Sequence, residues 1–337
     1  MKRLDYYWYN KGFLSLVLTP VSWLYCFVAI MRRKAYRLGL LKSHRIPVPV
    51  IIVGNITAGG TGKTPLVTWL IELLRDRGYS PGIVSRGYGG AARNWPQQVR
   101  VDSDPRMVGD EAVLLAHRCQ CPMAVGPGRV EAALALLEHK NCDIIVADDG
   151  LQHYALERDV EIAVIDGVRR FGNGKCLPAG PLREPRKRMR SVDITVTNGV
   201  PGPREFQMTL KPGPVQNFVD SRQSHSLGSF SKISKQVHGV AGIGNPDRFF
   251  QQLKSHGLDV IEHPFPDHYM YQDEDLYFDD DLPVLMTEKD AVKCRSFADR
   301  RYWIVPVDAE VDERIIPLIF RLIGPKDSGA SVSIQKN

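Results

Sequence analysis

The stretch IIVGNITAGGTGKTPLVTWLIELL, residues 51–74, constrains the fold most, because it joins three patterns in a fixed order. An unbroken apolar run leads into a glycine-rich turn, and Lys63, Thr64 and a segment with apolar residues at helical spacing follow. Strands that lack polar alternation are typical of a parallel sheet covered on both faces. The stretch therefore predicts a strand–turn–helix unit at the edge where the carboxyl ends of parallel strands meet.

The turn has the chemistry of a phosphate-binding loop. Glycines allow backbone N–H groups to approach a phosphate closely, Lys63 can reach the β- and γ-phosphates, and Thr64 can ligate Mg²⁺. Pro65 suits the first turn of a helix, whose N-terminus favours negative charge. We therefore expect a nucleotide to bind at this loop, with the backbone of Gly59, Gly60 and Gly62 close to its phosphates.

Two positions of this loop are unusual. The common spacing G-x-x-x-x-G-K-[ST] requires a glycine where Thr57 stands. The G-G-x-G-K-T variant of partition-type NTPases has a lysine where Ala58 stands. The absence of that lysine counts against an ATPase switch of that kind.

The rest of the chain repeats the strand-and-helix alternation. Up to Asn198, short apolar runs alternate with helical segments, which predicts a doubly wound, mainly parallel α/β sheet like that of P-loop NTPases. A second strand–loop–helix unit begins near Gln236 and predicts a smaller α/β domain, with a cleft between the two. The predicted divisions are an N-terminal membrane-associated helical segment (1–40), a kinase core (41–200), a smaller domain joined by a β-ribbon linker (201–325) and a disordered tail (326–337).

A second acidic segment can complete the nucleotide site. In DIIVADDGLQH, Asp148 and Asp149 follow an apolar strand. Adjacent carboxylates repel one another unless a cation neutralises them, so the pair favours Mg²⁺. One of the two can instead cap the turn at Gly150, and Asp166, at the end of IAVID, is a weaker candidate.

Two further groups are candidates for proton transfer. Asp110, in RMVGDEA, begins a predicted helix, and His268, in HPFPDHYMY, lies among prolines and aromatic residues. A kinase often accepts the proton of its acceptor hydroxyl with a carboxylate. From the residues alone, however, a helix cap is the simpler interpretation of Asp110, and a structural role is the simpler one of His268.

The N-terminus predicts contact with a membrane. GFLSLVLTPVSWLYCFVAIM, residues 12–31, has no formal charge and is followed at once by RRKAYR. The length suits a membrane span of about 20 residues, but Pro20 and several hydroxyl groups weaken that interpretation. A helix lying at the membrane surface and a buried packing helix are the alternatives. If the helix spanned the membrane, the basic flank would keep the rest of the chain in the cytoplasm. No cleavage site for a removed signal peptide follows the apolar run.

The net charge of +6 comes from clustered basic residues, including LREPRKRMR at 182–190. Such clusters suit phosphates or anionic lipids, or are simply solvated surface. Because no nucleic-acid-binding motif accompanies them, we expect no nucleic-acid partner.

Taken together, the motifs resemble those of the tetraacyldisaccharide 4'-kinases. The resemblance covers nearly the whole chain and rests on an ordered set: GNITAGGTGKTP, SRGYGG, GDEA, VADDGLQH, LPAGPLREP, GIGNP, FPDHY and TEKDAVK. It implies an enzyme at the cytoplasmic face of the inner membrane, which transfers the γ-phosphate of ATP to the 4'-hydroxyl of a tetraacylated glucosamine disaccharide 1-phosphate. We expect it to be a monomer.

The resemblance also implies roles for particular residues. The ATP phosphates would be held by Thr57, Ala58, Gly59, Gly60, Thr61, Gly62, Lys63 and Thr64. Asp110 would be the general base, His268 its partner from the other domain, and Lys63 would neutralise charge on the transferred group. The metal neighbourhood would contain Thr64, Asp148, Asp149 and Glu184, and substrate contacts would come from Arg86 and Arg183.

Two other functions remain open from the sequence. One is a membrane-associated nucleotide switch with no phosphoryl acceptor, and the other is a kinase for a soluble sugar or cofactor. The sequence does not give the acyl-chain preference or the residues that bind adenine, although TEKD, residues 287–290, follows a buried run where base-reading motifs can occur.

Overall fold

The predicted strand–turn–helix unit lies at the centre of a nine-stranded sheet in the computed structural model, which describes residues 4–9 and 13–324. The strand order is β15-β8-β7-β6-β1-β5-β2-β4-β3, and all neighbours are parallel except at the two edges, β3 with β4 and β15 with β8. The strands are β1 (Val50–Gly54), β2 (Pro81–Ser85), β3 (Gln97–Val99), β4 (Met123–Val125), β5 (Ile144–Asp148), β6 (Val160–Asp166), β7 (Ile194–Asn198), β8 (Phe206–Pro212) and β15 (Val307–Val311). The predicted mainly parallel α/β fold is confirmed.

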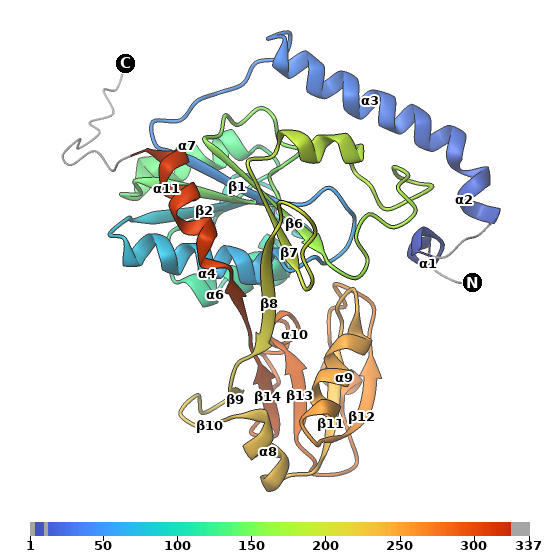
Figure 1. Ribbon diagram of the computed structural model, residues 1–337. Coiled ribbons are helices and arrows are strands. Elements are labelled where there is room, and N and C mark those ends of the chain that lie inside the picture. The colour runs from blue at the N-terminus through green and yellow to red at the C-terminus, as the bar shows by residue number, and fades with distance from the viewer. Residues whose placement is uncertain (1–3, 10–12, 325–337) are drawn as a thin grey trace.

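Both faces of this sheet are covered, as the unbroken apolar strands require (Figure 1). Ile51 and Val53 of β1 pack in one core with the helices α4, α6 and α11, whereas Val50 and Ile52 pack in another with α7 and the loops of residues 151–182. The helices of this unit are α4 (Lys63–Asp76), α5 (Pro105–Val108), α6 (Asp110–Cys119), α7 (Arg129–His139) and α11 (Ile316–Ile323).

A second, smaller sheet forms the lower unit of Figure 1. Its strand order is β10-β9-β14-β13-β11-β12, with a parallel group formed by the last four and antiparallel strands at the β10 edge. The elements are β9 (Val215–Asn217), β10 (Ser224–His225), α8 (Leu227–Ile233), β11 (Gln236–Ala241), α9 (Pro246–Ser255), β12 (Asp259–Pro264), β13 (Val284–Thr287), α10 (Glu288–Ala291) and β14 (Tyr302–Val305).

The chain crosses between the two units twice, from β8 to β9 and from β14 back to β15. The crossings touch, because Gly213 N donates a hydrogen bond to Pro306 O over 2.9 Å. The predicted boundary at residue 200 precedes β8, whereas the division between the sheets follows it. At this junction β8 pairs with β15, so the two paired strands come from residues 206–212 and 307–311.

The N-terminal segment lies against the large unit through its polar side. It comprises α1 (Leu4–Tyr9), α2 (Phe13–Val17) and α3 (Thr19–Arg37). Ser15 and Ser22 are buried, and their hydroxyl groups donate to the backbone oxygens of Ala179 and Cys176 over 2.8 and 2.7 Å.

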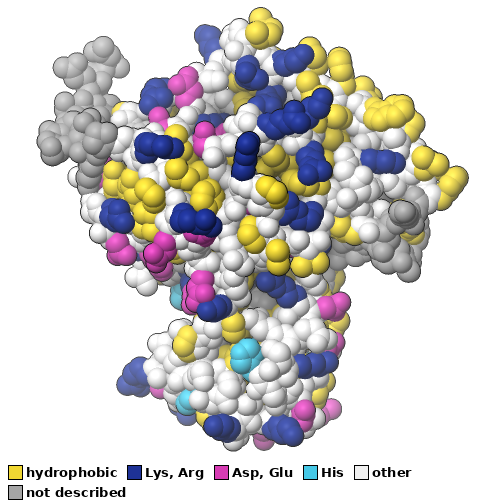
Figure 2. All heavy atoms as spheres, viewed as in Figure 1, with side chains coloured by type: hydrophobic (Ala, Val, Ile, Leu, Met, Phe, Trp, Pro, Cys, Tyr) yellow, Lys and Arg dark blue, Asp and Glu magenta, His cyan; other side chains and the backbone are white. Residues whose placement is uncertain are grey.

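The apolar side chains of the same helices point away from the protein. The exposed ones include Phe13, Leu16, Val17, Val21, Trp23, Leu24, Phe27 and Val28. Figure 2 shows hydrophobic side chains along this edge of the molecule with Lys and Arg side chains beside them. The polarity of the segment is therefore inverted relative to a helix on the surface of a water-soluble core.

Within residues 4–9 and 13–324, no helix has both the length and the apolar character needed to cross a membrane. The interpretation of residues 12–31 as a span thus finds no support. The predicted disordered tail, 326–337, lies outside the described residues.

Candidate active site

The phosphate loop connects β1 to α4 and opens onto a cavity of about 1050 Å³ between the two units. Gly62, at φ 96°, caps α4, and a Cβ there would lie 3.0 Å from Met208 Cε and 3.1 Å from Asn198 Nδ2. Glycine is thus required both by backbone angle and by space. The loop residues that line the cavity are Ala58, Gly59, Gly60, Gly62, Lys63 and Thr64.

The two other threonines of the loop, Thr57 and Thr61, are not among the residues that line the cavity. Thr57 and Thr61 are buried, and the amide nitrogen of Asn55 lies 3.5 and 3.3 Å from their hydroxyl oxygens. Thr57 also forms a β-bridge with Leu182. Their side chains therefore brace the loop from within the protein, which explains why a glycine is not needed at position 57.

Asp148 ends β5 and is almost completely enclosed, at 2% exposure. Burial raises its pKa to about 7, against the opposing charge of Lys63 and with the help of Asp149 and Glu111. Ser85 Oγ donates to Oδ2 over 3.1 Å, while Oδ1 has no hydrogen-bond partner among the described residues. A buried carboxylate oxygen without a partner is a candidate ligand for a cation that arrives with the substrate.

Asp149 has the opposite character. Its φ is 48°, so the backbone turns it toward two cations: Lys63 Nζ at 3.4 Å and Arg183 Nη1 at 3.0 and 2.8 Å from its two oxygens. Burial would raise its pKa, but Lys63 and Arg183 hold it well below the ordinary range. The predicted residues Lys63, Asp149 and Arg183 thus meet in one charged group.

Glu184 does not belong to this group. It is buried and is not among the described residues that line the cavity. Its oxygens accept hydrogen bonds from Gln152 and Tyr154, and Arg188 Nε lies 3.7 Å away. Glu184 was expected near the metal, but protein donors already bond to both of its carboxylate oxygens. Its position therefore indicates a structural role.

Asp110 and His268 come together from the two units. Nδ1 of His268 donates to both Asp110 oxygens, over 3.1 and 3.0 Å. Asp110 is the first residue of α6, is 4% exposed, and also accepts from the backbone N–H of Glu111 at 2.8 Å. His268 has φ 62°, a left-handed conformation that is rare outside glycine and often found at functional sites.

The surroundings of Asp110 favour its charged form. Burial would raise its pKa, but the hydrogen bond from His268 and the charges of Lys289 and Lys293 lower it below the ordinary value. The hydrogen bond to Asp110 in turn raises the pKa of His268. A carboxylate that stays ionised can accept a proton, and His268, which contacts it, lines the cavity.

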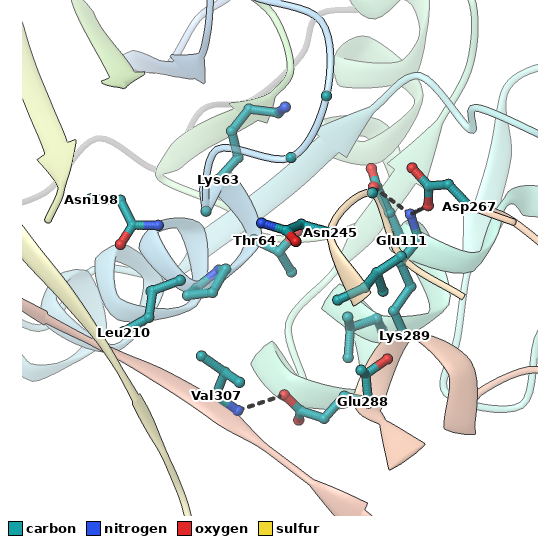
Figure 3. A pocket seen from close by; sticks show the side chains of 18 of the residues that line it. Lys63, Thr64, Glu111, Asn198, Leu210, Asn245, Asp267, Glu288, Lys289 and Val307 are labelled. Carbon is teal, nitrogen blue, oxygen red and sulfur yellow. Dashed lines mark hydrogen bonds and ion pairs between the residues drawn. The ribbon is translucent and has the colours of Figure 1, made fainter. Parts of the chain in front are cut away.

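Several residues of the cavity were not predicted. Lys289 contacts both Glu111 and Asp267 (Figure 3). Arg169 donates to Gly60 O and pairs with Asp166 at 2.9 Å, so Asp166 supports the loop. Asn198, which ends β7, donates to Thr61 O at 3.3 Å. The signal for Asn198 was available, since polar residues at the carboxyl ends of parallel strands tend to face the ligand.

Two predicted positions remain, the substrate contacts expected at Arg86 and Arg183. Arg86, exposed, and Arg183 both line the cavity. Among the described residues, no cluster of three or more His, Cys, Asp or Glu side chains suits a metal ion.

Comparison with known proteins agrees with the motifs. A family model described as tetraacyldisaccharide-1-P 4'-kinase matches residues 14–323. The tetraacyldisaccharide 4'-kinase of Nitrosococcus oceani is 56% identical over 306 residues, covering 90% of this chain and 89% of the relative. That of Methylobacillus flagellatus is 50% identical, covering 95% of this chain and 96% of the relative.

A solved structure has the same fold. The "apo" form of LpxK from Aquifex aeolicus, in complex with ATP, superposes with a TM-score of 0.78 at 29% identity and covers 92% of this chain and 100% of that one. The resemblance inferred from the motifs is thereby confirmed, and the chain belongs to the tetraacyldisaccharide-1-P 4'-kinase family.

Proposed function

We propose that this protein transfers the γ-phosphoryl group of ATP to the 4'-hydroxyl group of tetraacyldisaccharide 1-phosphate. Membership of the family supports the reaction, and the ATP in the related structure supports the donor. The observation that carries the proposal is the contact of Asp110 with His268, which lines the same cavity as the phosphate loop.

Two groups of residues divide the chemistry. The N–H groups of the phosphate loop and Lys63 would neutralise charge on the transferred phosphoryl group, for which fixed donors are the main source of catalysis. Asp110, oriented by His268, would accept the proton of the attacking hydroxyl group. Arg86 and Arg183, which line the same cavity, would bind phosphate groups of ATP or the lipid.

Mg²⁺ is part of the proposal. Mg²⁺ is commonly held by one or two protein oxygens together with substrate phosphates and water. The hydroxyl group of Thr64 and the unpartnered Oδ1 of Asp148 fit that donor set. When bound, the ion would supply charge neutralisation for the phosphates. Asp149, engaged by Lys63 and Arg183, would orient those two cations.

The protein would act at the cytoplasmic face of the inner membrane, with α2 and α3 lying at the membrane surface. The support is the outward-facing apolar side chains of these helices and the basic residues Arg32, Arg33, Lys34 and Arg37 that follow. Apolar burial combined with attraction to anionic headgroups is the usual basis of such binding. We also propose a monomer, because Asp110 and His268 already meet within one chain through its two units.

The test is incubation of the purified full-length protein with γ-labelled ATP, Mg²⁺ and detergent-dispersed tetraacyldisaccharide 1-phosphate. We expect the label on the lipid, at the 4'-position. Release of label only as inorganic phosphate would instead favour the nucleotide switch. A chain lacking residues 1–35 should lose activity on lipid in vesicles, and full retention would contradict the membrane role proposed for α2 and α3.

A further inference from the structure

Two lysines lie beside Asp110 on one short segment of the second unit. α10 begins after Thr287, whose side chain caps it by accepting from Asp290 N at 3.2 Å. Lys289 and Lys293 are separated by four residues and lie on the same side of this turn. The Nζ atoms of both are 4.0 Å from the same oxygen, Oδ2 of Asp110.

Lys289 joins the two units. Its Nζ lies 3.1 Å from Glu111 Oε1, on α6 of the large unit. The same atom lies 2.9 Å from Asp267 Oδ1 and 3.4 Å from His268 Nε2, both in the loop after β12 of the small unit. The side chain is only 14% exposed. Burial would lower its pKa, but the carboxylates of Glu111, Asp110 and Asp267 raise it above the ordinary value, so Lys289 stays charged.

Lys293 is held differently. Its side chain is fully enclosed and pairs at 2.8 Å with Asp290, which is equally enclosed. Its Nζ also lies 5.0 Å from the centre of the Tyr271 ring. Asp290 further accepts from Gly242 N and Thr287 Oγ1, so this pair is part of the core of the small unit. The charge of Lys293 is thus neutralised within its own unit, whereas that of Lys289 is shared between the two.

We propose that Lys289 is a positioning residue for proton transfer. It clamps His268 and Asp267 of the small unit onto Asp110 and Glu111 of the large one, and it keeps Asp110 negatively charged. The need for such a cation follows from the reaction, because bound lipid and ATP exclude water and bring further negative charge toward Asp110. This inference rests on the proposed role of Asp110 as the base.

The charged and titratable groups that face Asp110 define what a pH measurement would report. Glu111 belongs to its own helix, Asp267 and His268 to the loop after β12, and Lys289 and Lys293 to the α10 segment. Tyr88, whose ring centre lies 5.2 Å from that of His268, covers the pair from the loop after β2. Of these groups, Lys289 is the one whose ammonium group donates hydrogen bonds to carboxylates of both units, Glu111 and Asp267.

The test compares Lys289→Met with Lys289→Arg in the full-length protein, by steady-state kinetics over pH 5–9. For Lys289→Met we expect kcat to fall by about 10–100-fold, the scale of a small misplacement of a catalytic group, with KM for ATP within about twofold. The acid limb of kcat/KM for the lipid should move to higher pH, since loss of a nearby cation makes Asp110 easier to protonate. Lys289→Arg should restore the position of that limb.

Glu111→Gln provides a control of opposite sign. It removes a negative charge near Asp110 and leaves Lys289 in place, so the acid limb should move to lower pH. The inference is overturned if the limb stays in place in Lys289→Met, or if Lys289→Arg resembles Lys289→Met, because a merely structural lysine would not set the limb. Should Lys289→Met fail to fold, the inference is decided by the other two variants. It requires the acid limbs of kcat/KM in Lys289→Arg and Glu111→Gln to lie at different pH values. Failure of the proposed function is distinct, since the unaltered protein would then not phosphorylate the lipid.

Discussion

Asp110 and Asp148 are two buried aspartates near one cavity: Asp148 lines it, and Asp110 contacts His268, which lines it. They have nearly the same burial, at 4% and 2% exposure, yet their pKa values shift in opposite directions. Burial would raise the pKa of Asp110, but His268 and two lysines overcome it. Burial raises the pKa of Asp148 to about 7, because Lys63 alone does not compensate and Asp149 and Glu111 add to the shift. Equal burial therefore has unequal consequences, decided by the charges nearby.

The difference separates two kinds of site. The acceptor side, around Asp110, contains its own compensating charges, taken from both units. The phosphate side, around Asp148, retains an unpartnered oxygen and an uncompensated carboxylate. An ionised Asp148 is costly until a cation binds, so we infer that the phosphate side is completed by its ligands and the acceptor side by closure of the two units on each other.

The largest effect should come from Asp110→Asn, which keeps the shape and removes the proton acceptor. We expect kcat to fall by about 10²–10⁴-fold, the usual scale for loss of a general base, while ATP affinity stays within a fewfold. The measurements are transfer of label to the lipid and equilibrium binding of ATP.

Lys63→Met is the matched change on the phosphate side and should weaken ATP binding itself. If Asp110→Asn weakens ATP binding as strongly as Lys63→Met does, the two sides are not separable and the comparison fails. If Asp110→Asn keeps near-normal turnover, the base is another group.

The phosphate side was predictable because its parts are local in sequence. β1, the loop and α4 are contiguous, and Asp148 and Asp149 follow a strand whose apolar run is plain in the sequence. The strand neighbours β5 and β1 bring these segments together, as expected for a parallel sheet. The roles of individual residues on this side, such as the bracing position of Thr57, could be assigned only from the structure.

The acceptor side was predictable only by resemblance. Asp110 and His268 are 158 residues apart and meet through the packing of two units, which no local pattern records. The segment that contains Lys289 was considered for base recognition, and its contact with Asp110 and His268 depends on how α10 packs on α6. Glu184 shows the converse: its hydrogen-bond partners Gln152 and Tyr154 come from another segment, so the motif around Glu184 does not record that its carboxylate is already bonded.

A smaller effect, on stability, should follow from Asp148→Asn. The folded-state pKa of about 7 lies above the ordinary value of 3.8, so between these pH values the folded state binds more protons than the unfolded state. The free energy of unfolding therefore falls as pH rises through this interval and remains low above it. Asp148→Asn should abolish transfer but raise Tm at pH 8, without nucleotide, by at least about 2 °C.

Thermal unfolding measured from pH 4 to pH 9 checks this. The advantage of Asp148→Asn should be smallest near pH 4, grow with pH and level off above about pH 7. Asp110→Asn should show the opposite sign, a lower Tm at pH 8, because it weakens contacts with His268 and the lysines. Destabilisation by both variants would contradict the distinction between the two aspartates.

The smallest effect, and the sharpest test, concerns the hydroxyl group that Asp148 does contact. Ser85 Oγ donates to Oδ2 over 3.1 Å, which favours the charged form, so Ser85→Ala should raise the pKa of Asp148 further, by about one unit. The Tm advantage of Asp148→Asn should therefore level off at a higher pH when Ser85 is also replaced by Ala. The increase in that pH should equal the increase in the pKa of Asp148. Ser22→Ala is the control, because it removes an equally buried hydroxyl that donates to the Cys176 carbonyl oxygen, and it should lower Tm equally at every pH. If Ser85→Ala behaves like Ser22→Ala, its hydroxyl contributes packing alone, and the pKa of Asp148 is then set by burial and by the charges of Lys63, Asp149 and Glu111.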